Sequence, residues 1–151
     1  MIVKIHFGLV VASSIFGILS TAGTKWESIN GVHLGLWNVC VHSEKQSYCS
    51  DRETSAALVV TQILMILGCL GYLTSFIYFG FIHLKIKTLG HKHIGILIIL
   101  SAILSMSGLV VYSRYLKITN LTSYNWSFAF GCVSIVIALI NGVTLTANYI
   151  T

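Results

Sequence analysis

Long apolar runs separated by short polar segments dominate the hydropathy pattern of the chain. No charged residue lies between residues 54 and 82 or between residues 93 and 112, and none follows Lys117. A helix needs about 20 mostly apolar residues to cross a membrane, so these runs are long enough. We predict one domain over residues 1–151, with four transmembrane helices at about residues 5–23, 55–82, 93–113 and 126–149.

The first apolar run also fits a second interpretation. Lys4, an apolar stretch at residues 7–19 and small residues at 20–22 form the pattern of a cleaved signal peptide. We favour a retained helix because residues 23–26 lead directly into the polar loop that follows. N-terminal sequencing that began near Gly23 would contradict the four-span prediction.

The distribution of charge predicts the orientation in the membrane. The short segment 83–92 holds three lysines and no acid, whereas all four acidic residues lie in the segment 24–54. Lys-rich short loops stay in the cytoplasm. We therefore expect both termini in the cytoplasm, extracellular loops at about 24–54 and 114–125, and residence in the plasma membrane. Arg114 and Lys117 are a mild signal against this orientation.

The composition excludes several functional classes. The chain is only 9% charged, against about 25% for soluble domains, and its basic residues are dispersed, which excludes a nucleic-acid surface. No Asp, Glu, Lys or Arg lies at mid-membrane, where a pump or proton relay usually needs one. No CxxC, HExxH or phosphate-loop motif is present. We expect no catalytic residue, no cofactor and no resident metal.

Polar and small residues within the spans predict helix packing. Gln62 and Asn141 fit either a ligand site or hydrogen bonds between helices, and we favour the bonds. Cys69 and Cys132 are interpreted as small buried packing residues. Small residues recur at spacings of three and four in the fourth span, which predicts a helix-packing face or a face for a partner protein: Gly131, Ser134, Ala138 and Gly142.

The first loop has the pattern of a small sheet. Apolar residues alternate with polar ones between Trp26 and Val41, and Asn30-Gly31 is a strong two-residue hairpin signal. We predict strands at 25–29, 32–41 and 46–50. A sheet of this size is not stable alone, so it must rest on the outer ends of the helices.

The loop motif resembles that of a known superfamily. A Trp, a GLW triplet and two cysteines in the first extracellular loop of a four-span chain are similar to the claudins and to the peripheral myelin, epithelial membrane and lens-fibre membrane proteins. The short Trp-to-GLW spacing and the fourth-span segment SYNWSFAFGCVSIVIALINGV look more like the myelin and epithelial branch than true claudins. The matching residues are Trp26, Gly35, Leu36, Trp37, Cys40 and Cys49.

The resemblance implies a fold and roles for these residues. The fold is a left-handed four-helix transmembrane bundle with a small extracellular antiparallel β-sheet in the first outer loop. Cys40 and Cys49 form a disulfide in that sheet, and the Trp and GLW residues pack the sheet onto the bundle. These roles are structural.

Two further motifs in the loops are candidates for binding or modification. His33, His42 and Glu44 fit either a zinc site or exposed polar decoration, and we favour decoration. Asn120-Leu121-Thr122 is a glycosylation sequon, so Asn120 is a possible glycosylation site. Asn125 also starts a sequon, but it is a natural N-cap for the fourth span.

The resemblance and the lack of reaction chemistry lead to two functional hypotheses. The first is a non-enzymatic membrane organiser that acts on cell contacts through its sheet and spans and associates with itself. The alternative is an auxiliary subunit of an ion channel or receptor, bound through the transmembrane helices. The expected partners are membrane lipids and either a second copy or another integral membrane protein.

Overall fold

The computed structural model describes residues 2–29, 31–42, 46–83, 91–116 and 123–147. It contains four α-helices that are long and apolar enough to cross a membrane. The third continues as one π-helical turn, η1 (Tyr112–Leu116). The helices are α1 (Ile2–Ala22), α2 (Ala56–His83), α3 (His91–Val111) and α4 (Trp126–Ala147).

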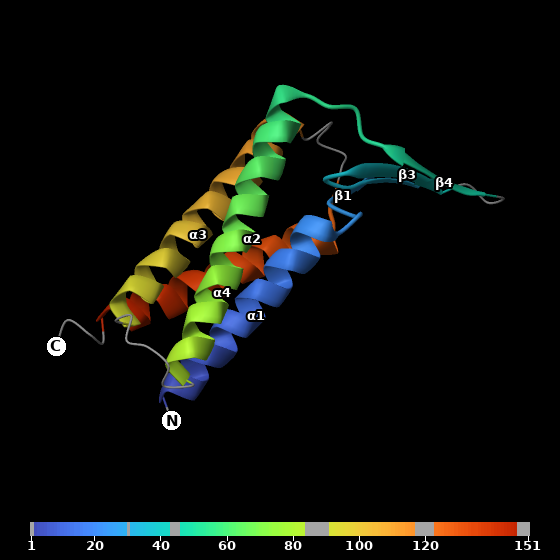
Figure 1. The fold of residues 1–151 in the computed structure, drawn as a ribbon. Helices are drawn as coiled ribbons and strands as arrows, with labels where there is room; N and C mark the ends of the chain where they lie inside the picture. The colour runs from blue at the N-terminus through green and yellow to red at the C-terminus, as the bar shows by residue number, and fades with distance from the viewer. Residues whose placement is uncertain (1, 30, 43–45, 84–90, 117–122, 148–151) are drawn as a thin grey trace.

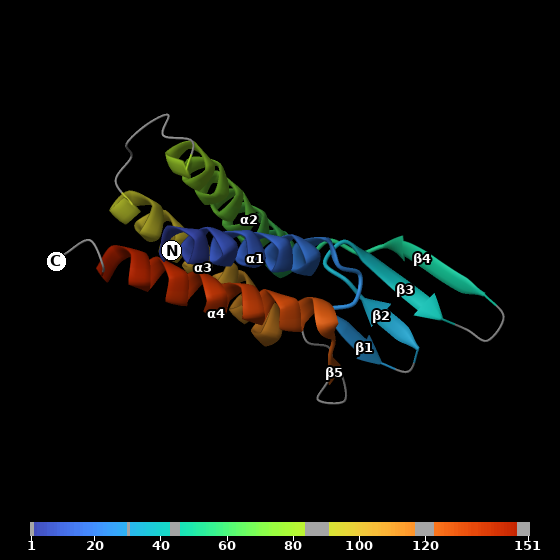
Figure 2. The same cartoon turned by 90° about the horizontal axis from the view of Figure 1, so that it is seen from below.

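The four helices form one bundle with the sheet at one end (Figure 1). Neighbouring helices in sequence are neighbours in space, and α1 also packs against α4, which closes the bundle. The sheet lies where α1 and α3 end and where α2 and α4 begin, and it extends sideways beyond the helices (Figures 1 and 2). Because α1 packs on both α2 and α4, it is an integral part of the bundle.

The sheet has five antiparallel strands in the order β4-β3-β2-β1-β5. Ile29 pairs with Val32 across the predicted two-residue turn, and Gly31 has a φ of 81°, which a glycine adopts without strain. The strands are β1 (Glu27–Ile29), β2 (Val32–Leu34), β3 (Asn38–His42), β4 (Ser47–Asp51) and β5 (Ser123–Tyr124).

The predicted single strand at 32–41 is wrong. It is two strands, β2 and β3, which fold back on each other so that Leu34 pairs with Val39. The chain turns at the GLW triplet, where the amide of Gly35 donates to the carbonyl of Asn38 at 2.8 Å. The alternation of polar and apolar residues continues through this turn, so the hydropathy pattern alone gave no sign of it.

The segment between η1 and α4 contributes a strand that the sequence did not predict. β5 pairs with β1 at the sheet edge nearest α4 (Figure 2). Asn125 follows it and caps α4, since its side-chain Oδ1 accepts from the amide of Trp126 at 2.8 Å. The Asn125 side-chain nitrogen donates to Ser28 of β1 at 3.4 Å. The described residues of the two segments, β5 with Asn125 and β1, therefore form one structural unit.

The small residues of α4 face the inside of the bundle. Gly131, Ser134, Ala138 and Gly142 are all buried, and the hydroxyl of Ser134 donates to the carbonyl of Ser13 in α1 at 2.7 Å. A Cβ on Gly142 would lie 2.6 Å from a side-chain carbon of Ile99 in α3. The alternative of a partner-facing stripe is therefore wrong, because α1 and α3 cover these residues.

The polar side chains in the spans bond within the molecule. Asn141 accepts from Nδ1 of His6 at 2.6 Å and donates to the His6 carbonyl at 3.2 Å, which joins α4 to α1. Gln62 bonds to the loop, not to another helix: it donates to the carbonyl of Leu36 at 2.9 Å. The interpretation of Cys132 as buried is wrong, because it is exposed on α4, whereas Cys69 is half-buried.

Candidate functional site: the sheet and its junction with the helices

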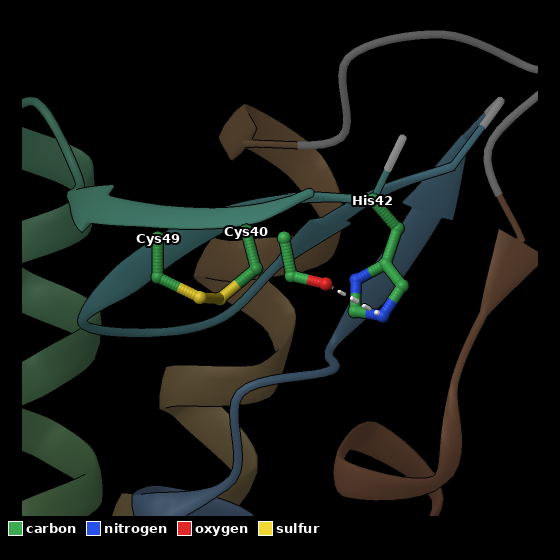
Figure 3. Close-up of a disulfide and its surroundings, with 4 residues drawn as sticks. Cys40, His42 and Cys49 are labelled. Atoms are coloured by element: carbon green, nitrogen blue, oxygen red, sulfur yellow. Dashed lines mark hydrogen bonds between the residues drawn. A yellow bond between two sulfur atoms is a disulfide. The ribbon is translucent and has the colours of Figure 1, made fainter. Parts of the chain in front are cut away.

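A disulfide joins the two strands farthest from α4. Cys40 of β3 and Cys49 of β4 are direct partners in the sheet register, and their sulfur atoms are bonded at 2.06 Å. Figure 3 shows the disulfide and the His42 side chain on the same side of the sheet. The bond that the resemblance implied is present, and it fixes β4 to the rest of the sheet.

Trp26 connects the sheet to three helices. Its side chain is completely buried, and its indole nitrogen donates to the carbonyl of Ser20 in α1 at 2.8 Å. Its ring contacts Tyr112 and Phe128, with centroids 4.6 and 5.8 Å away, from η1 and α4. Aromatic contacts of this kind contribute about 0.5–1.5 kcal/mol each beyond the area they bury. Trp26 is therefore the central packing residue of the junction.

Gly35 and Leu36 occupy positions that exclude most other residues. A Cβ on Gly35 would lie 2.8 Å from Oδ1 of Asn38 and 3.0 Å from Cα of Thr24. Leu36 is completely buried in the same core as Trp26, and its carbonyl accepts from Gln62 of α2. These two residues place the turn between β2 and β3 directly on the bundle.

Trp37 lies at the edge of the junction. Its side chain is 41% exposed, and its indole nitrogen donates to the carbonyl of Thr21 at 2.7 Å. Its ring borders an open apolar groove of about 260 Å³ between α1 and α2, which is also lined by Ile18, Ile66 and Leu70. Trp37 therefore both fixes the turn on α1 and contributes an apolar surface next to the membrane.

Arg52 also connects the sheet to the helices. Its guanidinium donates to the carbonyl of Gly35 at 2.7 Å and to the hydroxyl of Tyr112 at 3.3 Å. It also lies 5.5 Å from the centre of the Tyr112 ring. The Arg52 amide donates to the carbonyl of Trp37 at 3.0 Å. The sequence contained one signal for this role. It was a charged residue shortly after the second cysteine, where the sheet leads into α2.

Two more residues of the junction are completely buried. Tyr112 lies at the end of the predicted third span, where tyrosines often lie at the membrane interface, but its side chain is completely buried. Glu27 is also completely buried, as the register partner of Leu34 and Tyr124. Loss of water and the nearby Glu27 carboxylate raise the pKa of the Tyr124 hydroxyl above its usual value. Neither burial is visible in local hydropathy.

The sheet presents an apolar row at its far end. Register partners in an antiparallel sheet share a face, so one row crosses four strands from Ile29 through Val32 and Val41 to Tyr48. The first two are partly covered, whereas Val41 is 43% and Tyr48 is 69% exposed. β4 is the outer strand, and all its residues are exposed. We call Val41 and Tyr48 the exposed end of the row.

A second exposed apolar surface runs along α4. Val133, Val136, Ile140 and Val143 recur at spacings of three and four, so they share one face of the helix, and each is 42–57% exposed. In a membrane this ridge faces lipid or another transmembrane protein. It lies opposite the small residues that pack inside the bundle.

The remaining predicted site residues belong to the glycosylation and zinc-site hypotheses. Asn120 and Glu44 lie outside the described residues. The rings of His33 and His42 lie 5.8 Å apart between centroids. Within the described part of the chain, no group of three or more His, Cys, Asp or Glu side chains is arranged to hold a metal ion.

These features agree with the comparison to known protein families. The model of the PMP-22/EMP/MP20/Claudin family matches residues 1–145. The chain belongs to this family. It is also similar to mouse claudin domain-containing protein 2, with 27% identity over 139 residues that cover 89% of this chain and 78% of that protein. Family membership and the four spans make the chain a multi-pass membrane protein; placement in the myelin and epithelial branch stays a prediction.

Proposed function

We propose that this chain is a non-enzymatic organiser of cell contacts that associates with copies of itself through the extracellular sheet. The exposed end of the apolar row, Val41 and Tyr48, carries the proposal. A half-exposed Val beside an exposed Tyr is the kind of apolar and aromatic pair that interfaces bury. The disulfide holds both residues in a fixed geometry, which lowers the entropic cost of association.

The edge strand supports the same surface. β4 forms one edge of the sheet, and the described residues contribute no strand on its outer side. An open edge has unpaired backbone groups that pair readily with another chain. A sheet that extends beyond the helices, as in Figure 1, leaves room for a second copy at this edge.

A mixed-cell experiment tests the proposal. Two cell populations express the chain with different tags, and one tag is precipitated after the cells form contacts. We expect co-precipitation of the other tag, and its loss in the double variant Val41→Thr/Tyr48→Thr, since truncating a central aromatic contact often costs about 2 kcal/mol or more. Ser47→Thr, on the opposite face of β4, is the matched control. Equal recovery from all three proteins would contradict the proposal.

The alternative, an auxiliary subunit of a channel or receptor, is supported by the α4 ridge. Replacing Gly142 with Leu does not test it, because Gly142 packs against α3. Val136→Trp adds bulk to the ridge, which fluid lipid accommodates but a tightly packed partner helix does not. Purification in mild detergent with mass spectrometry would then show a stoichiometric channel or receptor that Val136→Trp removes and Val136→Leu retains. Recovery of only this chain would contradict the alternative.

The proposal places the chain in the plasma membrane with both termini in the cytoplasm. The Lys-rich segment between α2 and α3 supports this orientation, because the sheet then lies outside the cell. We also propose a glycan on Asn120. A glycosidase-sensitive shift in mobility that Asn120→Gln removes would support both points. Modification of an introduced N-terminal sequon in intact cells would contradict the orientation.

A further inference from the structure

We propose that His33 and His42 form a binding site for a divalent transition-metal ion of the zinc class on the extracellular sheet. This inference is independent of self-association, since a metal ion bound to one sheet needs no second copy. It concerns a side of the sheet that the disulfide shares and that the apolar row does not use.

The sheet register brings the two imidazoles together. His33 of β2 is the register partner of Cys40 in β3, so His42 is its diagonal neighbour on the same face. The two ring centroids lie 5.8 Å apart with an angle of 61° between the planes. Two imidazoles that share a zinc ion at Zn–N distances of 2.0–2.1 Å have centroids about 5 Å apart. The observed separation is therefore within about 1 Å of the one that a shared zinc ion requires.

The hydrogen bonds of the rings leave nitrogen atoms for a metal ion. Nδ1 of His33 is shielded from solvent and has no hydrogen-bond partner, which is unusual for a polar atom in this setting. Nε2 of His42 bonds to the hydroxyl of Ser47 at 3.2 Å, and this bond orients the ring (Figure 3). When Nε2 carries the proton, Nδ1 of His42 has the lone pair. Such bonds typically orient histidine ligands in metal sites.

The local charges limit the affinity of the site. The Lys25 ammonium lies close enough to His33 to act on the ring electrostatically, and its charge opposes the approach of a cation. Replacing Lys25 with Gln should therefore strengthen metal binding, a change that a purely structural role of the histidines would not produce.

Because the two cysteines form a disulfide, only the histidines are available as protein ligands at this site. Cys40 and Cys49 lie on the same face, but their sulfur atoms are bonded to each other and do not act as thiolate ligands. Two imidazole nitrogens leave the other zinc positions to water. Imidazole ligands suit zinc and copper, whereas magnesium prefers oxygen ligands.

Titration of the purified full chain with zinc against a chelating indicator dye tests the site. All proteins carry the substitution His93→Gln, which removes an exposed histidine of α3 from the background. We expect saturable zinc binding that magnesium does not displace, its loss in His33→Gln and in His42→Gln, and stronger binding in Lys25→Gln. Unchanged zinc binding in both histidine variants would overturn the proposal.

A second measurement does not depend on whether the His33 and His42 variants fold. Zinc should protect His33 and His42 of the His93→Gln protein from acylation by diethyl pyrocarbonate, as measured by mass spectrometry, while His6 is unchanged. Equal acylation of His33 and His42 with and without zinc would also overturn the proposal.

Discussion

At the scale of single residues, a few side chains decide how the sheet rests on the helices. Trp26 packs between η1 and α4, and Arg52 spans from the GLW turn to Tyr112. The motif predicted the role of Trp26, because the Trp is part of the family pattern. It did not predict the contact between Arg52 and Tyr112, because these two residues are 60 positions apart in the sequence.

Arg52 is the first residue to test. Arg52→Gln removes a charged hydrogen bond to Gly35 and weakens the contact with Tyr112. Hydrogen bonds to charged groups contribute about 1.5–3 kcal/mol to stability. Because Arg52 is only half-buried, we expect the free energy of unfolding to fall by an amount near the low end of this range. Thermal unfolding in detergent measures it. Arg114→Gln, at an exposed position, is the control, and an equal shift in both variants would contradict this role.

His33 predicts a dependence of stability on pH. Its pKa in the folded chain lies below the unfolded value of about 6.5, so the folded state binds fewer protons. The contribution of the neutral His33 ring to the free energy of unfolding is present above pH 6.5, and it is lost as the pH falls below that value. Midpoints of unfolding between pH 7.5 and 5 should therefore fall more for the unmodified chain than for His33→Gln. Parallel curves would be inconsistent with the lowered pKa.

At the scale of elements, the helices followed from hydropathy and the strands only in part. Runs without charge were long enough to locate four spans. The break between β2 and β3 was missed, because the alternating pattern passes through Gly35 and the turn depends on contacts with Thr24 and α2. β5 was missed because two residues that pair with a distant strand have no pattern of their own.

The disulfide should stabilise the sheet measurably. It closes a loop with a sequence separation of 9, for which the chain-entropy model gives about 2–3 kcal/mol. Cys40→Ser/Cys49→Ser should lose free energy of unfolding of that size. Cys132→Ser, at an exposed position of α4, should have no effect. Similar stability of all three proteins under oxidising conditions would show that the bond does not restrain the unfolded chain.

The packing of α4 on α3 gives a test of the helix interior. A larger side chain at Gly142 meets Ile99 and the carbonyl of Gly95 at 3.0 Å, and backbone atoms do not move aside easily. We expect Gly142→Leu to lower the free energy of unfolding by about 1–3 kcal/mol. Val143→Leu, on the neighbouring ridge, should be neutral. Greater stability of Gly142→Leu would show that α3 and α4 are not packed as described.

At the scale of the whole molecule, two of the exposed apolar surfaces support different proposed functions. The row on the sheet ends in Val41 and Tyr48 outside the bundle, whereas the ridge of α4 runs along a span. Composition predicted neither surface, because both depend on which residues the fold leaves uncovered. The bundle covers the small residues of α4 and leaves Val133, Val136, Ile140 and Val143 exposed, the reverse of a partner-facing small-residue stripe.

Photo-crosslinking in cells at position 48 tests the central claim most directly. A photoreactive amino acid replaces Tyr48, or Val136 as the comparison, in cells that also meet neighbours with a differently tagged copy. The organiser function predicts a crosslinked product of two tagged copies from position 48 and none from position 136. A product from position 136 with a channel or receptor, and none from position 48, would contradict it.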